Sequence, residues 1–139
     1  KWEPAPRWEW TAKYAMVRGR DRSGELPLVF MPPDNLHASI SHYLPSLGAL
    51  EEIRLGLNGR YVFEQTRLEP EQDFLAPPGS YWLLGFELEA RLELHKSDLR
   101  FTLQAENLLD QSYRDYLNRF RYYADEMGRN VRVGVRWGF

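Results

Sequence analysis

The chain has 139 residues, a net charge of −2 and 43% hydrophobic residues, and its pI is about 6.0. This composition excludes an intrinsically disordered chain and gives no general electrostatic basis for binding nucleic acid. The absence of cysteine excludes a disulfide framework and a thiolate metal site, and a mean hydropathy of −0.57 is too polar for a helical membrane protein.

Alternation of apolar and polar residues is the main pattern of the chain, and it predicts strands because successive side chains of a strand point to opposite faces. The fourth segment is the clearest: apolar residues occupy the even positions from Trp82 to Leu94, and charged residues alternate with them at odd positions from Glu87 to Glu93, followed by His95. A helix would scatter such residues around its surface. We therefore predict an all-β fold, an antiparallel up-and-down meander of about six long strands. The alternating segments are 8–16, 36–41, 53–64, 82–95, 99–106 and 131–139.

The connections between these segments differ in length. Residues 45–49 and 96–98 form short turns, whereas 18–34, 65–80 and 110–130 form long loops. Short turns at one end and long loops at the other are typical of outer-membrane barrels. Some strands have the 9–11 residues that a spanning strand needs, and aromatic residues at strand ends suggest an interfacial girdle. Those aromatic residues are Trp8, Trp82, Trp137 and Phe139.

Six strands are fewer than the minimum of about eight in single-chain membrane barrels, and unpaired strand edges are not tolerated in lipid. The chain also begins without an initiator Met or a signal peptide. We therefore expect it to be part of a larger barrel.

Two stretches near the C-terminus resemble motifs of TonB-dependent outer-membrane receptors. The sequence Ala-Glu-Asn-Leu-Leu-Asp-Gln-Ser-Tyr at 105–113 is similar to the penultimate-strand motif of that family, Glu/Asp-Asn-Leu-x-Asp/Asn-x-x-Tyr. The segment 122–130 resembles the loop before the last strand, where Gly-Arg-Asn precedes the alternation, and the Pro-Pro-Asp at 32–34 also fits. The matching residues are Glu106, Asn107, Leu108, Asp110, Tyr113, Gly128, Arg129 and Asn130.

This resemblance implies a 22-stranded barrel with an N-terminal plug domain, in the outer membrane of a Gram-negative bacterium. Residues 1–139 would form the C-terminal segment of the barrel, without the plug. The whole receptor would import scarce cargo such as an iron–siderophore complex, haem, cobalamin or another metal complex. Its implied partners are the rest of the barrel and the plug domain, the TonB complex through the missing N-terminal part, the barrel-assembly machinery and outer-membrane lipid. Trp137 and Phe139 would form the family's terminal assembly signal.

Charged residues of both signs lie on the polar side of the predicted strands. They fit a lumen-facing wall that holds a plug through ion pairs, and equally a solvated sheet face, where single exposed pairs contribute about 0–1 kcal/mol. The predicted lumen-facing residues are Arg54, Arg60, Glu87, Glu89, Arg91, Arg100, Glu106, Arg132 and Arg136.

The segment 113–123 interleaves basic and aromatic residues, and three interpretations fit it. Stacking and phosphate contacts would suit nucleic acid, but the neutral charge and the lack of a known RNA motif argue against this partner. An extracellular loop could contact cargo or lipopolysaccharide, or the segment could pack against the barrel wall. Asn107 and Tyr113 are expected to close the strand end. The candidate cargo-contact residues are Tyr116, Arg119, Phe120, Arg121, Tyr122 and Tyr123.

No arrangement of residues indicates an enzyme. His37, His42 and His95 lie in different segments without metal spacing, and there is no Ser/His/Asp, Cys/His or phosphate-loop motif. We therefore expect no catalytic residue, cofactor or metal. The alternative function is a small soluble β-barrel or sandwich that binds an apolar ligand, because alternation does not show which face points outward.

Overall fold

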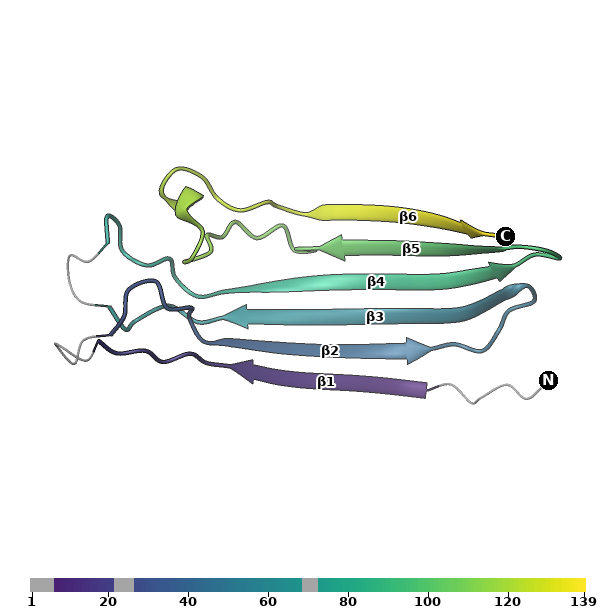
Figure 1. Cartoon of the computed structure of the whole chain (residues 1–139), viewed down its shortest axis with the longest axis horizontal. Coiled ribbons are helices and arrows are strands. Elements are labelled where there is room, and N and C mark those ends of the chain that lie inside the picture. The colour runs from purple at the N-terminus through teal and green to yellow at the C-terminus, as the bar shows by residue number, and fades with distance from the viewer. Residues whose placement is uncertain (1–6, 22–26, 69–72) are drawn as a thin grey trace.

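The computed structural model describes residues 7–21, 27–68 and 73–139, so parts of two predicted long loops lie outside the described residues. The predicted all-β meander is confirmed: six antiparallel strands form one sheet in sequence order (Figure 1). The one helical element described, η1 (Arg119–Tyr122), has four residues, and no described helix is long and apolar enough to cross a membrane. The strands are β1 (Arg7–Ala15), β2 (Asn35–Tyr43), β3 (Leu50–Val62), β4 (Tyr81–Glu93), β5 (Asp98–Glu106) and β6 (Asn130–Gly138).

Cross-strand pairing divides the sheet into an apolar and a polar face, because directly opposed residues share a face. On the apolar face Leu88 of β4 pairs with Leu55 and Leu103, and Leu103 pairs with Val133 of β6. The register carries the same face to β1, where Trp10 pairs with Ile40. The apolar face comprises residues 8, 10, 12 and 14; 36, 38, 40 and 42; 55, 57, 59 and 61; 82 to 92 at even positions; 99, 101, 103 and 105; and 131, 133, 135 and 137.

The polar face consists of the intervening residues. Arg54 pairs with Glu89, Arg91 with Arg100, and Arg100 with Arg136. Gln104 lies between Glu87 and Arg132, and Arg60 lies beside His37. The register therefore brings all nine predicted lumen-facing residues onto this one face.

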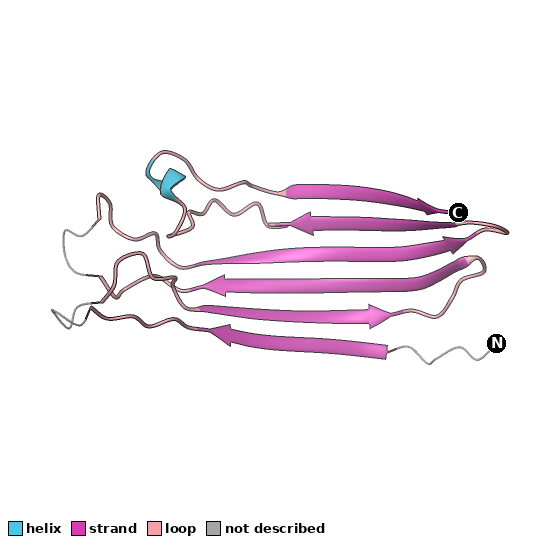
Figure 2. Ribbon diagram, in the orientation of Figure 1, coloured by secondary structure: helices cyan, strands magenta, loops and turns pink. Residues whose placement is uncertain are grey.

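The sheet is a single open layer that is not closed into a barrel (Figure 2). Side chains of the apolar face consequently stay uncovered: Trp10 is 83% exposed, Val133 74% and Trp137 66%. Few hydrophobic residues of the described chain are buried. All of these lie in strands except Tyr116, which lies in the connection between β5 and β6. They are Ile53, Val62, Tyr81, Ala90, Ala105 and Tyr116.

A β-bulge interrupts the pairing of β3 with β4 between Glu51 and Arg54. Glu52 has a φ of 51°, which is unusual for a residue other than glycine. Because a bulge places an extra residue in one strand, it breaks the period of two. This is why alternation predicted a start at Ile53, whereas β3 begins at Leu50.

The connections follow the predicted asymmetry. Residues 44–49 and 94–97 form the short connections at one end of the sheet, where β6 also ends. The described parts of the three long connections lie at the opposite end (Figure 1). Short hydrogen bonds close the turns: Leu47 and Leu50 bond reciprocally through their backbones, and Leu94 N donates to Ser97 O at 2.8 Å. We call the two ends the short-turn end and the long-loop end.

Candidate functional site

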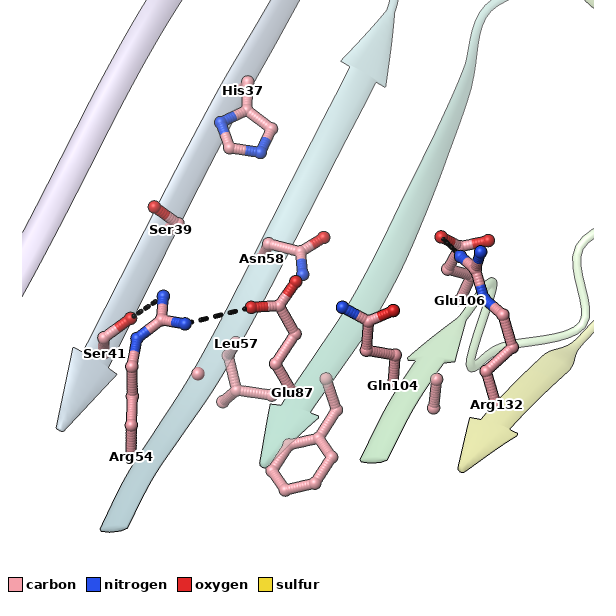
Figure 3. Close-up of a pocket in the computed structure, with 13 residues that line it drawn as sticks. His37, Ser39, Ser41, Arg54, Leu57, Asn58, Glu87, Gln104, Glu106 and Arg132 are labelled. Carbon is pink, nitrogen blue, oxygen red and sulfur yellow. Dashed lines mark hydrogen bonds and ion pairs between the residues drawn. The ribbon is translucent and has the colours of Figure 1, made fainter. Parts of the chain in front are cut away.

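A trough of about 430 Å³ crosses the middle of the polar face. Ser39 and Ser41 of β2, Gly56 and Asn58 of β3 and Gln104 of β5 line it, together with charged side chains (Figure 3). Small residues lower its floor, and the charged side chains form its two sides. The trough is thus a polar depression suited to a partner with complementary polar groups. The charged lining residues are Arg54, Glu87, Glu106 and Arg132.

Arg54 bridges three strands in this trough. Its Nη2 donates to Ser41 Oγ at 3.0 Å and its Nη1 to Glu87 Oε2 at 3.3 Å (Figure 3). A second carboxylate, Glu89, lies 4.0 Å from the same Nη1. On the other side of the trough Arg132 pairs with Glu106. The walls therefore present fixed charges of both signs.

A second ion network lies at the short-turn end, where the bulge directs two glutamates to the polar face. Arg91 lies 2.9 Å from Glu51 and 3.0 Å from Glu52, and Glu52 lies 3.4 Å from Arg100. Glu52 pairs with both Arg91 and Arg100, which oppose each other directly in the ladder. Like charges directly opposite destabilise a strand pair, so the bulged carboxylate compensates this contact.

The motif residues form a clasp between β5 and β6. Asn107 adopts a φ of 49° and is 5% exposed. Its Oδ1 accepts from Gln111 N and its Nδ2 donates to Gln111 O, both at 2.9 Å. Asparagine tolerates this left-handed backbone better than most residues. The side chain thus closes a tight turn at the end of β5.

Asp110 and Gly128 complete the clasp. Asp110 Oδ1 accepts from the backbone N–H of Arg129 at 2.8 Å, directly before β6 begins. A Cβ at Gly128 would lie 2.7 Å from that carboxylate oxygen, so a larger residue there would displace the Asp110 side chain from its hydrogen bond. Tyr113 packs on Tyr81 with ring centroids 4.6 Å apart. Each motif residue therefore makes a contact that shapes the β5–β6 connection, which explains the spacing of Asn107, Asp110, Tyr113 and Gly128.

A buried ion pair connects two of the long loops. Arg121, 3% exposed, pairs with Asp73, whose side chain is 6% exposed and also accepts from the hydroxyl of Tyr122. The Arg121 guanidinium lies over the rings of Tyr116 and Tyr122, with its Cζ 4.8 and 4.6 Å from their centroids. We call Asp73, Tyr116, Arg121 and Tyr122 the loop latch.

The predicted cargo-contact residues divide into two groups. Tyr116 and Arg121 are buried and Tyr122 is half-buried, so these three side chains serve the latch rather than a surface. Arg119 is exposed and stacks over Phe30, whereas Phe120 and Tyr123 are 74% and 85% exposed. Only these last three residues remain open to a partner at the long-loop end.

Asp34 organises another cluster at the long-loop end, directly before β2. Its carboxylate accepts two hydrogen bonds from Arg18, at 2.6 and 2.7 Å, and one from the Tyr14 hydroxyl at 2.7 Å. Arg67 contributes a further contact at 3.3 Å. The hydrogen bonds from Arg18 and then Tyr14 hold the pKa of Asp34 well below its usual value, so it stays ionised at neutral pH.

Other predicted residues lie apart from these clusters. Trp137 and Phe139 are exposed at the short-turn end, with ring centroids 6.1 Å apart. His42 lies on the apolar face and stacks on Trp8 at 4.0 Å, and His37 lines the trough. Among the described residues no three histidine or acidic side chains are grouped as a metal site requires.

Asp73, Glu51 and Glu52 are site residues that sequence reasoning missed. Asp73 lies in a loop, and its partner Arg121 is 48 positions away, so no periodic signal connects them. The adjacent pair Glu51-Glu52 was a visible break in the alternation, just before the predicted start of the third strand at Ile53. Comparison with protein families, with curated proteins and with solved structures finds no match to this chain.

Proposed function

We propose that the chain is part of the wall of a transmembrane β-barrel in the outer membrane of a Gram-negative bacterium. The apolar face contacts lipid and the polar face lines the lumen. The observation that carries this proposal is the uncovered apolar face of a single-layer sheet, with exposed tryptophans and valines. Monomeric soluble proteins rarely expose a contiguous apolar surface of this kind.

The height of the apolar face supports the proposal. On β4 it extends from Trp82 to Leu92, which at about 3.3 Å per residue is about 33 Å along the strand. A barrel strand tilted by about 40° would convert this length to about 25 Å, the height of a typical lipid-facing band. Aromatic residues flank the band: Tyr14, Tyr61 and Trp82 at the long-loop end, Trp8 and Trp137 at the short-turn end.

We further propose that the barrel belongs to a TonB-dependent receptor, of which this chain is the C-terminal portion. The support is the receptor-like motif, whose residues form the clasp at the β5–β6 connection. In this receptor the trough faces the plug domain, and its fixed charges of both signs pair with polar groups of the plug. The alternative, a soluble barrel or sandwich, needs a second layer over the apolar face, and the described residues contain none.

Fractionation of the full-length protein tests this proposal. After expression in a Gram-negative host, we expect the protein in the outer-membrane fraction, resistant to a urea wash and released only by detergent. Lipid contact over the whole apolar face is the reason, because a peripheral protein would be removed by the wash. Recovery in the soluble fraction would contradict the proposal.

A further inference from the structure

The apolar face has a groove near the long-loop end. Ala38 of β2 pairs with Ala12 of β1 on one side and with Gly59 of β3 on the other. This row across three strands therefore carries only very small side chains. Larger residues on both sides of the row rise above it. The groove has a volume of about 400 Å³ and is lined by Leu36, Ala38, Gly59, Arg60, Tyr61 and Trp82. All of these except Arg60 belong to the apolar face.

Polar and charged groups lie where the groove meets the long-loop end. Tyr14 pairs with Leu36 of the groove, and its hydroxyl donates to Asp34. Asp34 is in turn held by Arg18 and Arg67, whose side chains are 43% and 32% exposed. Two guanidinium groups around one carboxylate leave a formal excess of one positive charge. A cationic, solvent-accessible cluster therefore lies around Asp34, two residues before Leu36 of the groove.

We propose that this groove binds one acyl chain of an anionic lipid, whose phosphate group contacts Arg18 and Arg67. The inference rests on the proposed function, because it needs the apolar face to lie in a membrane. The acyl chain fills the space over Ala38 and Gly59, beside the row formed by Leu36, Tyr61 and Trp82. The cationic cluster lies just beyond the aromatic boundary of the band, at the depth of lipid headgroups.

A second copy of the chain fits the groove less well than a lipid. Two barrels in one membrane have the same vertical orientation, so a symmetric contact would bring the two cationic clusters to the same height. Like charges would then face each other in a poorly solvated region, which is unfavourable. An anionic lipid instead supplies the opposite charge at that height.

Fluorescence quenching by brominated lipids tests the inference, because Trp82 lines the groove. The full-length protein is reconstituted in phosphatidylcholine vesicles in which a minor share of lipid is brominated on its acyl chains, either phosphatidylglycerol or phosphatidylcholine. The quenching of Trp82 is obtained by subtracting the fluorescence of the Trp82→Phe variant from that of the unmodified protein, with and without brominated lipid. We expect the groove to bind brominated phosphatidylglycerol about fivefold more strongly than brominated phosphatidylcholine. This is the gain in affinity for one basic charge next to an anionic headgroup. Trp137, measured in the same way, should show no such preference.

Four variants separate the acyl and headgroup contacts. Gly59→Leu fills the groove and should abolish the preference at Trp82; a Cβ at this position meets only Leu83 O at 4.0 Å. Val133→Leu, on the same face of β6, should leave the preference unchanged. Arg18→Gln should remove it and Asp34→Asn should increase it, because the first lowers and the second raises the positive charge. A merely structural role of this cluster would give both changes the same sign.

The outcomes distinguish the two proposals. Equal occupancy of the groove by both lipids, or a preference that survives Gly59→Leu and Arg18→Gln, would overturn the groove inference while leaving the barrel intact. If neither brominated lipid quenches Trp82 or Trp137, the face does not contact lipid, and the proposed function and the inference are both refuted.

Discussion

Val133→Arg is expected to lower the free energy of unfolding in a bilayer by about 2–4 kcal/mol, the cost of an arginine at the middle of the band that we propose faces lipid. Val133 lies in the row Leu55–Leu88–Leu103–Val133 at the centre of the apolar face and is 74% exposed. Its replacement removes little packing within the sheet, so the loss of stability would come from placing the charged side chain in lipid. Urea unfolding of the full-length protein in phospholipid vesicles measures it.

The matched control for this substitution is Thr11→Arg on the polar face. Thr11 pairs with Ser39 and lies outside the residues that line the trough. In the proposed barrel an arginine there faces the hydrated lumen beside the trough, so we expect a change below about 1 kcal/mol. Equal losses for both variants, or a larger loss for Thr11→Arg, would contradict the assignment of the apolar face to lipid.

Arg121→Met is the second large effect, and it acts on the long loops rather than on the sheet. It leaves the Asp73 carboxylate buried without its ion-pair partner, which costs about 3 kcal/mol, the lower end of the range for a broken buried pair. Because the latch connects loops 63–80 and 107–129, this loss should appear as local opening. We expect proteolytic cleavage within 107–129 to become roughly a hundredfold faster when opening is rapid.

Two further variants show whether the ion pair itself is the cause. Arg119→Met removes an exposed neighbouring arginine, which stacks over Phe30 at 5.8 Å, and should leave the cleavage rate nearly unchanged. Asp73→Leu combined with Arg121→Met replaces both charges by apolar groups and should restore most of the protection. Protection in Arg121→Met like that of the unmodified protein would show that the latch does not hold the loops.

The sheet could be predicted from the sequence because its signal is local. Each strand alternates one apolar and one polar residue, so the faces of β4 and β6 followed from position alone. The bulge at Glu51–Arg54 could not be predicted, since an inserted residue cancels the periodicity that identifies a strand. The clasp was predictable only in outline. Its motif indicated a strand end at Asn107, but not the left-handed backbone that makes asparagine suitable there.

The loop contacts could not be predicted, because they join residues that no pattern relates. Arg121 and Tyr116 appeared as basic and aromatic candidates for contact with cargo, yet the structure buries both. Arg121 pairs with Asp73 and lies over the rings of Tyr116 and Tyr122. Interleaved charge and aromaticity describes a surface for a partner and an internal cation–π cluster equally well. The small-residue groove also required the register, since Ala12, Ala38 and Gly59 meet only through pairing across three strands.

The most direct measurement of which face meets lipid is site-directed spin labelling of β4 in the full-length protein, reconstituted in phospholipid vesicles. This chain has no cysteine, so single cysteines introduced here carry the label selectively once any elsewhere are removed. We predict that labels at Leu84, Phe86 and Leu88 are accessible to oxygen, which concentrates in lipid. Labels at Glu87, Glu89 and Arg91 should instead be accessible to a water-soluble nickel chelate. The reversed pattern, or nickel access at all six positions, would contradict the account.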